Sequence, residues 1–138
     1  MTATFMEKIV CFKTEGWSMW PVIKPGEVVF VEKASSENIN PGDSVVYKIN
    51  NDCFLHRVVG EKNDRLLIND DTATTGLLNV NKKDIVGKLV SGNCLSKGFS
   101  GLVYSNIYRF IFPIIYKLKK FIIITDKKCL LEVEKDEI

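Results

Sequence analysis

Residues 44–60, SVVYKINNDCFLHRVVG, contain two apolar runs separated by a polar turn. The runs at 44–48 and 53–60 are rich in Val and aromatic residues, which favour β-strands. The Asn-Asn-Asp sequence at 50–52 is typical of a tight turn. The stretch therefore predicts a β-hairpin, and His56, the single histidine of the chain, lies on its second strand.

Similar short runs occur on both sides of this hairpin, and turns containing Gly, Pro or Asp separate them. Short strands at this spacing are typical of an all-β barrel or a coiled sheet. We therefore predict a mainly β domain over residues 1–96. The further strands are expected at 8–13, 27–33, 65–69 and 84–91.

The composition changes near Gly98. Residues 102–125 are strongly apolar, and their apolar side chains recur at helical spacing. We predict an amphipathic or membrane-associated helix over 97–125, which Pro113 should kink or divide, and a short, frayed, charged tail over 126–138. Four basic residues interrupt the apolar segment, namely Arg109, Lys117, Lys119 and Lys120.

These basic residues decide how the C-terminal segment is expected to meet a membrane. The part before the lysines, 102–116, is shorter than the roughly 20 residues that a spanning helix needs, and Arg109 interrupts it. The lysines that follow are typical of an interface. A helix lying in the membrane surface fits better than a span, so we expect membrane association through this helix. The alternative is a helix packed on the β domain. Charged residues interrupt 1–17, so no N-terminal targeting segment is expected.

Charge and cysteine usage limit the possible partners and cofactors. The 19 basic and 17 acidic residues leave a formal charge of +2, which argues against nucleic acid as the main partner. One histidine and four widely spaced cysteines without a CxxC pair predict no metal site, and the cysteines are expected to be buried. No Gly-rich phosphate loop is present. We therefore expect no metal, nucleotide or organic cofactor.

Three positions carry groups that can work together in acyl transfer. Ser18 lies in a Gly- and Pro-containing loop, 16–21, where backbone N–H groups can face an oxyanion, but its hydroxyl needs a base. His56 has the ordinary pKa of a base at neutral pH, and Asp70 or Asp71 could accept the imidazole N–H. Taken singly, each has an ordinary structural explanation: a turn serine, a strand histidine and solvated carboxylates. A cysteine nucleophile is less favoured, because no cysteine lies in a turn.

Five segments in one order resemble the signal peptidase I family, within the S24/S26 serine peptidase superfamily. Residues 18–26 (SMWPVIKPG) resemble its serine box, and 40–46 (NPGDSVV) resemble the box that follows. Residues 56–60 (HRVVG) are similar to the base-bearing strand in its archaeal and endoplasmic-reticulum form, where His replaces Lys. Residues 66–71 and 85–88 resemble the last box and the closing strand.

The resemblance implies a serine endopeptidase that removes signal or leader peptides from precursor polypeptides bound as extended strands. Ser18 would be the nucleophile, His56 the general base and Asp71 the group that orients His56. Asp70 is the alternative, because it stands where the family has Gly. Gly16 stands where the bacterial type often has a serine that supports the oxyanion, which leaves backbone N–H groups as donors.

Two other functions remain open from the sequence. One is a soluble peptidase of the related self-cleaving repressor superfamily, or an enzyme that trims the leader of a small peptide. Those repressors normally use a lysine base, which His56 does not match. The other is a non-catalytic β-barrel binding module, in which Ser18 would be inert toward an acylating probe.

Overall fold

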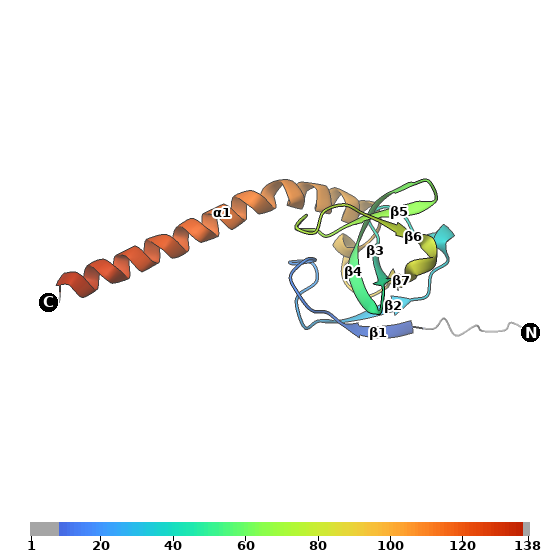
Figure 1. Cartoon of the computed structure of the whole chain (residues 1–138), viewed down its shortest axis with the longest axis horizontal. Coiled ribbons are helices and arrows are strands. Elements are labelled where there is room, and N and C mark those ends of the chain that lie inside the picture. Colours follow the sequence, from blue (N-terminus) through green and yellow to red (C-terminus); the bar gives the residue numbers. More distant parts are fainter. Residues whose placement is uncertain (1–8, 137–138) are drawn as a thin grey trace, which may run out of the picture.

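The computed structural model describes residues 9–136, apart from the side chains of Ser36 and of 121–136. It shows a β domain from which one long helix projects (Figure 1). The predicted mainly β fold with a C-terminal helix is confirmed. The elements are β1 (Ile9–Lys13), β2 (Val28–Glu32), β3 (Ser44–Ile49), β4 (Asp52–Lys62), β5 (Arg65–Asn69), β6 (Leu78–Asn81), β7 (Ile85–Leu89), α1 (Gly98–Asp136) and three short 3₁₀ turns at Ser36–Asn38, Lys82–Asp84 and Cys94–Ser96.

The seven strands form one sheet in the order β1-β2-β7-β3-β4-β5-β6, and each neighbouring pair is antiparallel. The predicted hairpin is β3 and β4, in which Val45 pairs with His56 and Tyr47 with Phe54. Strand β6 was not predicted, because its four residues, LNVN, are half asparagine and carry little β signal.

The coiled sheet buries two hydrophobic clusters on opposite faces of β3, since side chains alternate along a strand. Val45 and Tyr47 belong to one cluster and Val46 to the other. The second cluster also contains Met19 and Ile23 from the loop between β1 and β2. That loop is therefore fixed to the core by its own apolar side chains. The remaining members are Ile39, Val58, Leu66, Ile68 and Val80 in the first cluster, and Val29, Val31 and Leu89 in the second.

Two strand segments keep a backbone edge that no described strand covers. Residues 57–62 of β4 pair with β5 on one side, whereas 52–56 pair only with β3. Strand β1 pairs only with β2. Such edges can accept a further strand.

Helix α1 begins against the turn that precedes β3. The Gly98 N–H donates to Asp43 Oδ1 at 2.8 Å, and the backbones approach so closely that a Cβ on Gly101 would collide with the Arg57 guanidinium. The helix continues through Asp136 without a division at Pro113. The predicted end at residue 125 is therefore wrong for the described backbone, while residues 137–138 lie outside it.

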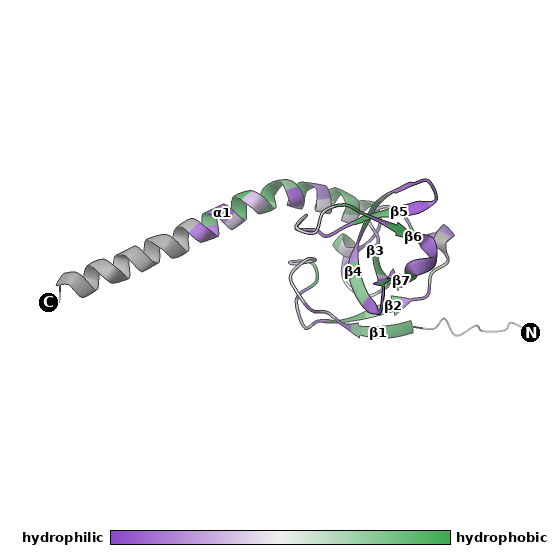
Figure 2. Cartoon of the chain, viewed as in Figure 1, coloured by the Kyte–Doolittle hydropathy of each residue, from purple (hydrophilic) through white to green (hydrophobic). Residues whose placement is uncertain are grey.

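Figure 2 shows that hydrophobic and hydrophilic residues are mixed along the coloured part of α1. No helix in the described part of the chain has an apolar stretch long enough to cross a membrane.

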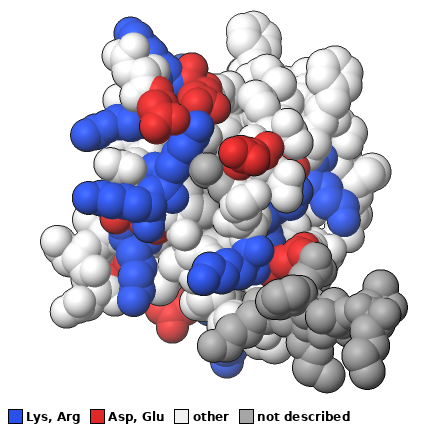
Figure 3. Space-filling view, turned by 90° about the vertical axis from the view of Figure 1, so that its right-hand side faces the viewer, with Lys and Arg blue, Asp and Glu red and all other residues white. Residues whose placement is uncertain are grey.

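The face shown in Figure 3 carries both Lys and Arg and Asp and Glu side chains. Ion pairs occur on the β domain, where Lys82 lies 2.6 Å from Glu61 and 2.9 Å from Asp64. The prediction of buried cysteines is wrong for Cys11, Cys53 and Cys94, which are exposed. Cys11 and Cys53 lie on strand segments with an open edge, and the side chain of Cys129 is outside the described set.

Candidate active site

The structure brings Ser18 and His56 into hydrogen-bond contact. Ser18 Oγ lies 3.2 Å from His56 Nε2, although the two residues are 38 positions apart in the chain. Ser18 comes from the loop between β1 and β2, and His56 from the middle of β4. A serine hydroxyl within hydrogen-bond reach of an imidazole is the arrangement of a nucleophile and its general base.

Buried side chains and backbone hydrogen bonds hold the loop that carries Ser18 in place. Met19 and Ile23 are buried in the core, and the Ile23 N–H donates to the Met19 carbonyl at 2.9 Å. The Ser18 carbonyl accepts the Asp71 N–H at 3.0 Å. Gly16, with φ of +78°, has the left-handed backbone that favours glycine. These contacts fix the position of the Ser18 hydroxyl over His56.

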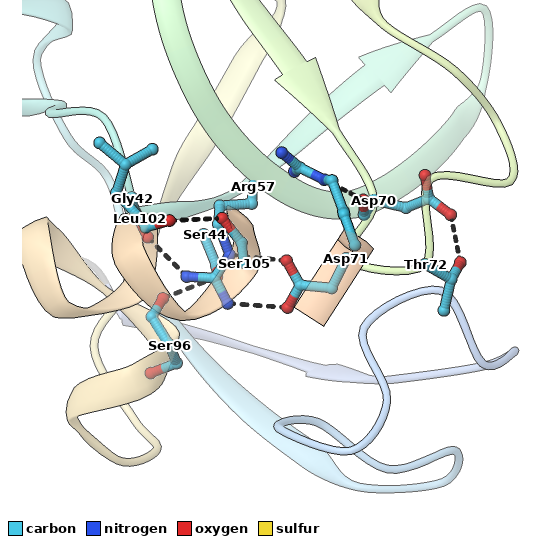
Figure 4. A network of polar contacts seen from close by, with 10 residues as sticks. Gly42, Ser44, Arg57, Asp70, Asp71, Thr72, Ser96, Leu102 and Ser105 are labelled. Carbon is cyan, nitrogen blue, oxygen red and sulfur yellow. Dashed lines mark hydrogen bonds and ion pairs between the residues drawn. The ribbon is translucent and has the colours of Figure 1, made fainter. Parts of the chain in front are cut away.

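Asp71 pairs with Arg57, the neighbour of His56 on β4. Its two carboxylate oxygens accept from Arg57 Nε at 2.7 Å and Nη2 at 2.8 Å (Figure 4), and both side chains are fully buried. Arg57 Nη1 also donates to the Gly42 carbonyl at 2.7 Å. The carboxylate that we expected to orient His56 is therefore engaged in a bidentate ion pair with Arg57.

Asp70 is fully buried and faces the turn that follows it. Its carboxylate accepts from the hydroxyls of Thr72 at 2.5 Å (Figure 4), Thr74 at 2.7 Å and Thr75 at 3.0 Å. Burial acts to raise the pKa of Asp70, but these hydrogen bonds outweigh it and hold the pKa below its ordinary value. Neither Asp70 nor Asp71 is a solvated turn carboxylate, and in the described structure neither one hydrogen-bonds to His56.

The second imidazole nitrogen contacts a residue that the sequence did not single out. Tyr47 Oη lies 2.8 Å from His56 Nδ1, and Tyr47 is itself buried in the core. The predicted hairpin contained the signal for this contact: when Val45 pairs with His56, Tyr47 stands diagonally opposite on the same face. A β-bulge between Val46 and Tyr47 lies at the same place.

Burial also sets the charge of His56. Removal from water lowers the pKa of His56 below its ordinary value, while the negative charges of Asp70 and Asp71 partly oppose this effect. The imidazole is therefore neutral at neutral pH, which is the form that can accept a proton from Ser18.

Ser18 and His56 line a cleft of about 450 Å³. One wall is residues 12–16, which begin in β1 and continue into the loop after it, and the other is 52–56 of β4. The floor includes the apolar side chains of Met19, Ile23, Val29 and Val46. The cleft thus lies between the two segments with uncovered edges. Within the described residues, no group of three or more His, Cys, Asp or Glu side chains is placed to hold a metal ion.

The comparison with known families agrees with a serine peptidase site. A search of curated proteins finds no match to the chain. The family model described as Peptidase S24-like matches residues 2–90, which is more than half of the chain and includes Ser18, His56 and both aspartates. On this match, the chain belongs to the Peptidase S24-like family.

Proposed function

We propose that this chain is a serine endopeptidase that cleaves signal or leader peptides from precursor polypeptides. The observation that carries the proposal is the 3.2 Å contact between Ser18 Oγ and His56 Nε2 at the side of an open cleft. The low pKa of His56 supports it, because a neutral imidazole can act as a base.

In the proposed reaction, Ser18 Oγ attacks the scissile carbonyl carbon while its proton moves to His56 Nε2. The negative oxygen of the tetrahedral intermediate accepts a hydrogen bond from the Ser18 N–H. The carbon–nitrogen bond then breaks, and His56 gives the proton to the leaving amine. Water loses a proton to His56 as it attacks the acyl-enzyme, and the proton returns to Ser18 when the acid product leaves.

The walls of the cleft favour an extended peptide as substrate. The uncovered edges of β1, which lines the cleft at 12–13, and of β4 at 52–56 offer backbone N–H and C=O groups to a strand placed between them. Together with the resemblance to signal peptidase I, this supports precursor segments with small residues at the first and third positions before the cut.

Cleavage of a peptide with an Ala-x-Ala site tests the proposal. We expect wild-type protein to cleave it, and both Ser18→Ala and His56→Ala to lose at least about 10³-fold in kcat/KM, because each removes one member of a unit that acts together. The peptide products are measured by mass spectrometry. Ser100→Ala, in the first turn of α1 and away from the cleft, is the control for replacing a serine.

Cleavage that survives Ser18→Ala would refute the assignment of the nucleophile. If the wild type cleaves no peptide, a serine-directed acylating probe distinguishes an unsuitable peptide from a binding module. Labelling of Ser18 indicates the former, and an inert Ser18 indicates the latter.

We further propose that α1 lies on an anionic membrane surface. Val103, Ile107, Ile111, Ile114 and Leu118 are all exposed and recur every three or four residues, so they form one apolar stripe. Trp17, beside Ser18, is also largely exposed, and the Lys119 ammonium lies 5.0 Å from the centre of the Trp20 ring. Lipid tails can cover such a stripe, and lysines next to it can pair with lipid phosphates.

Vesicle binding tests this second proposal. The full chain should sediment with phosphatidylglycerol vesicles, and reversal of Lys117, Lys119 and Lys120 to Glu should weaken binding about 100-fold, since each lysine contributes about 1 kcal/mol. The matched control reverses Lys48, Lys62 and Lys83, which are exposed on the β domain and give the same net charge. Equal weakening by both triple variants would indicate a net-charge effect and contradict a site on α1.

A further inference from the structure

Both nitrogens of the His56 ring contact a hydroxyl group, and the two hydroxyls lie on opposite sides of the ring. Ser18 Oγ is 3.2 Å from Nε2 and Tyr47 Oη is 2.8 Å from Nδ1. Neutral imidazole carries one proton, so it donates to one of these oxygens and accepts from the other. The two possible arrangements have opposite consequences for Ser18.

Only one of these arrangements leaves His56 able to act on Ser18. If Tyr47 donates to Nδ1, the ring proton is on Nε2 and faces Ser18, so His56 cannot accept the serine proton. If Nδ1–H donates to Tyr47 Oη, Nε2 is free to accept it. The imidazolium formed in the reaction keeps the second arrangement, because both of its nitrogens are donors and Tyr47 Oη can accept the Nδ1–H.

The surroundings of Tyr47 suit an acceptor that stays uncharged and in place. Burial, with the negative charge of Asp70, raises the pKa of Tyr47 to about 12, so the phenol remains neutral. The ring packs against Phe54 at a centroid distance of 5.8 Å, and Tyr47 has no exposed surface. Its hydroxyl is therefore fixed by the sheet and not by solvent.

We propose, on the basis of the proposed function, that Tyr47 is a positioning residue whose hydroxyl accepts the Nδ1–H of His56. The buried charge of Asp70 stabilises the imidazolium without a hydrogen bond to it. The two tasks that one carboxylate performs in a Ser–His–Asp triad are thus divided between a neutral hydroxyl and a carboxylate. The division is needed because Asp71 is paired with Arg57 and Asp70 is bonded by the threonines of its turn.

The charge of His56 depends on groups from several elements. Tyr47 comes from β3, and the Ser18 hydroxyl from the first loop. The carboxylates of Asp70 and Asp71 follow β5. Arg57 pairs with the Asp71 carboxylate. A second cation, Arg109 of α1, lies nearby and donates to the backbone carbonyl of Asp70 at 3.2 Å. A substitution that removes only the Tyr47 hydroxyl leaves all of these charges unchanged.

The first test is nitrogen-15 NMR of the imidazole in the full chain, where His56 is the single histidine and its signals are unambiguous. Above the pKa, wild type should show a proton on Nδ1 and a bare Nε2. Tyr47→Phe should lose this preference, and its His56 pKa should move down, because the imidazolium has lost an acceptor. A structural tyrosine that merely donates to Nδ1 would move that pKa up. Nε2–H in wild type, or an upward shift in Tyr47→Phe, would overturn the proposal.

The second test is kinetic. Tyr47→Phe should lower kcat about tenfold or more with little change in KM, because the lost hydrogen bond serves the reacting imidazole and not the substrate. The control is Tyr104→Phe, which removes the buried hydroxyl of a half-buried tyrosine whose pKa is also raised to about 12. It should leave the NMR signals and the rate unchanged. A Tyr47→Phe rate equal to that of Tyr104→Phe would overturn the role of Tyr47.

The two tests separate this inference from the proposed function. The NMR result does not depend on any substrate. A wild type that cleaves no peptide, leaves Ser18 unlabelled by the acylating probe and carries a proton on Nδ1 would refute the peptidase function and leave the contact of Tyr47 established. An active wild type with the proton on Nε2 would support the peptidase function and refute the role of Tyr47.

Discussion

Asp71 joins the nucleophile to the base through two different groups. Its backbone N–H binds the Ser18 carbonyl, and its carboxylate binds Arg57, next to His56. Asp71 therefore fixes the relative position of two segments that are distant in the sequence. We interpret Asp71 as a structural link between them, which differs from the orienting contact expected from the sequence.

Replacing Asp71 tests this interpretation. Asp71→Asn leaves the fully buried Arg57 guanidinium without its opposite charge, so the free energy of unfolding should fall by about 3–5 kcal/mol. Urea denaturation measures the loss. Glu61→Gln removes one acidic partner of Lys82 at an exposed ion pair and should leave stability nearly unchanged. A small loss in Asp71→Asn would mean that water reaches Arg57.

The pH dependence of cleavage follows from the lowered pKa of His56. Only neutral His56 can accept the Ser18 proton, so kcat/KM should fall as the pH drops through a midpoint below 6.5. The unfolded chain binds a proton on His56 at a higher pH than the folded chain, so stability also decreases as the pH falls from 6.5 through the folded pKa. Rates from pH 4 to 8, with circular dichroism to monitor folding, check both statements. A rate midpoint above 6.5 would contradict the burial of His56.

At the residue scale, the sequence singled out Ser18 and His56, which the structure brings into contact, but it did not indicate the partners of the other polar residues. Ser18 lies in a recognisable Gly- and Pro-containing loop, and His56 stands out as the single histidine on an apolar strand. The partners of Asp70 and Asp71 depend on the turn after β5 and on the burial of Arg57. Arginine is rarely buried unless it is paired. Nothing local in the sequence indicates that Arg57 is buried, so its pairing with Asp71 could not be predicted.

At the scale of elements, the start of α1 lies close to the turn before β3 because Gly42 and Gly101 have no side chains between the two backbones. A Cβ on Gly101 would lie 2.7 Å from the Gly42 carbonyl and would meet Arg57 Nη1. The same first turn is held by Asp43, whose carboxylate accepts the Gly98 N–H. The helix is therefore attached to the β domain through the turn that carries the NPGD sequence.

Gly101→Ala should destabilise the protein, although alanine favours helices by about 1 kcal/mol over glycine. The added methyl group displaces either Arg57 or the helix, and we expect a loss of about 1–3 kcal/mol. Thermal unfolding measures it, with Val103→Ala on the exposed face of the same helix as the control. A gain in stability would show that the start of α1 is free to shift.

Elements with a clear pattern were predicted, and the others were missed for physical reasons. The β3–β4 hairpin has apolar runs around a polar turn, β5 contains the apolar run LLI, and β7 begins with Ile-Val. Strand β6 is stabilised by pairing with β5, which its own residues do not indicate. Pro113 did not divide α1, although a proline inside a helix removes a backbone hydrogen bond.

At the scale of the whole molecule, the β domain and α1 serve the two parts of the proposed function. The sheet leaves two open edges around the cleft, and the helix projects from the β domain (Figure 1). The exposed stripe of α1 and Trp17 beside Ser18 would allow lipid contact near the site of cleavage. The superfamily and the mainly β fold were recognisable from the order of five sequence segments. Membrane association through α1 was also expected from the sequence, and it stays a proposal.

The link through Asp71 has a consequence for the chain as it is made. Ser18 emerges first during synthesis, but His56 and Asp71 follow more than 35 and 50 residues later. Until all three segments have folded together, the hydroxyl has neither its base nor its support. The proposed protease would therefore be inert as a nascent chain because its active site is incomplete, and it would cleave other polypeptides only after it had folded.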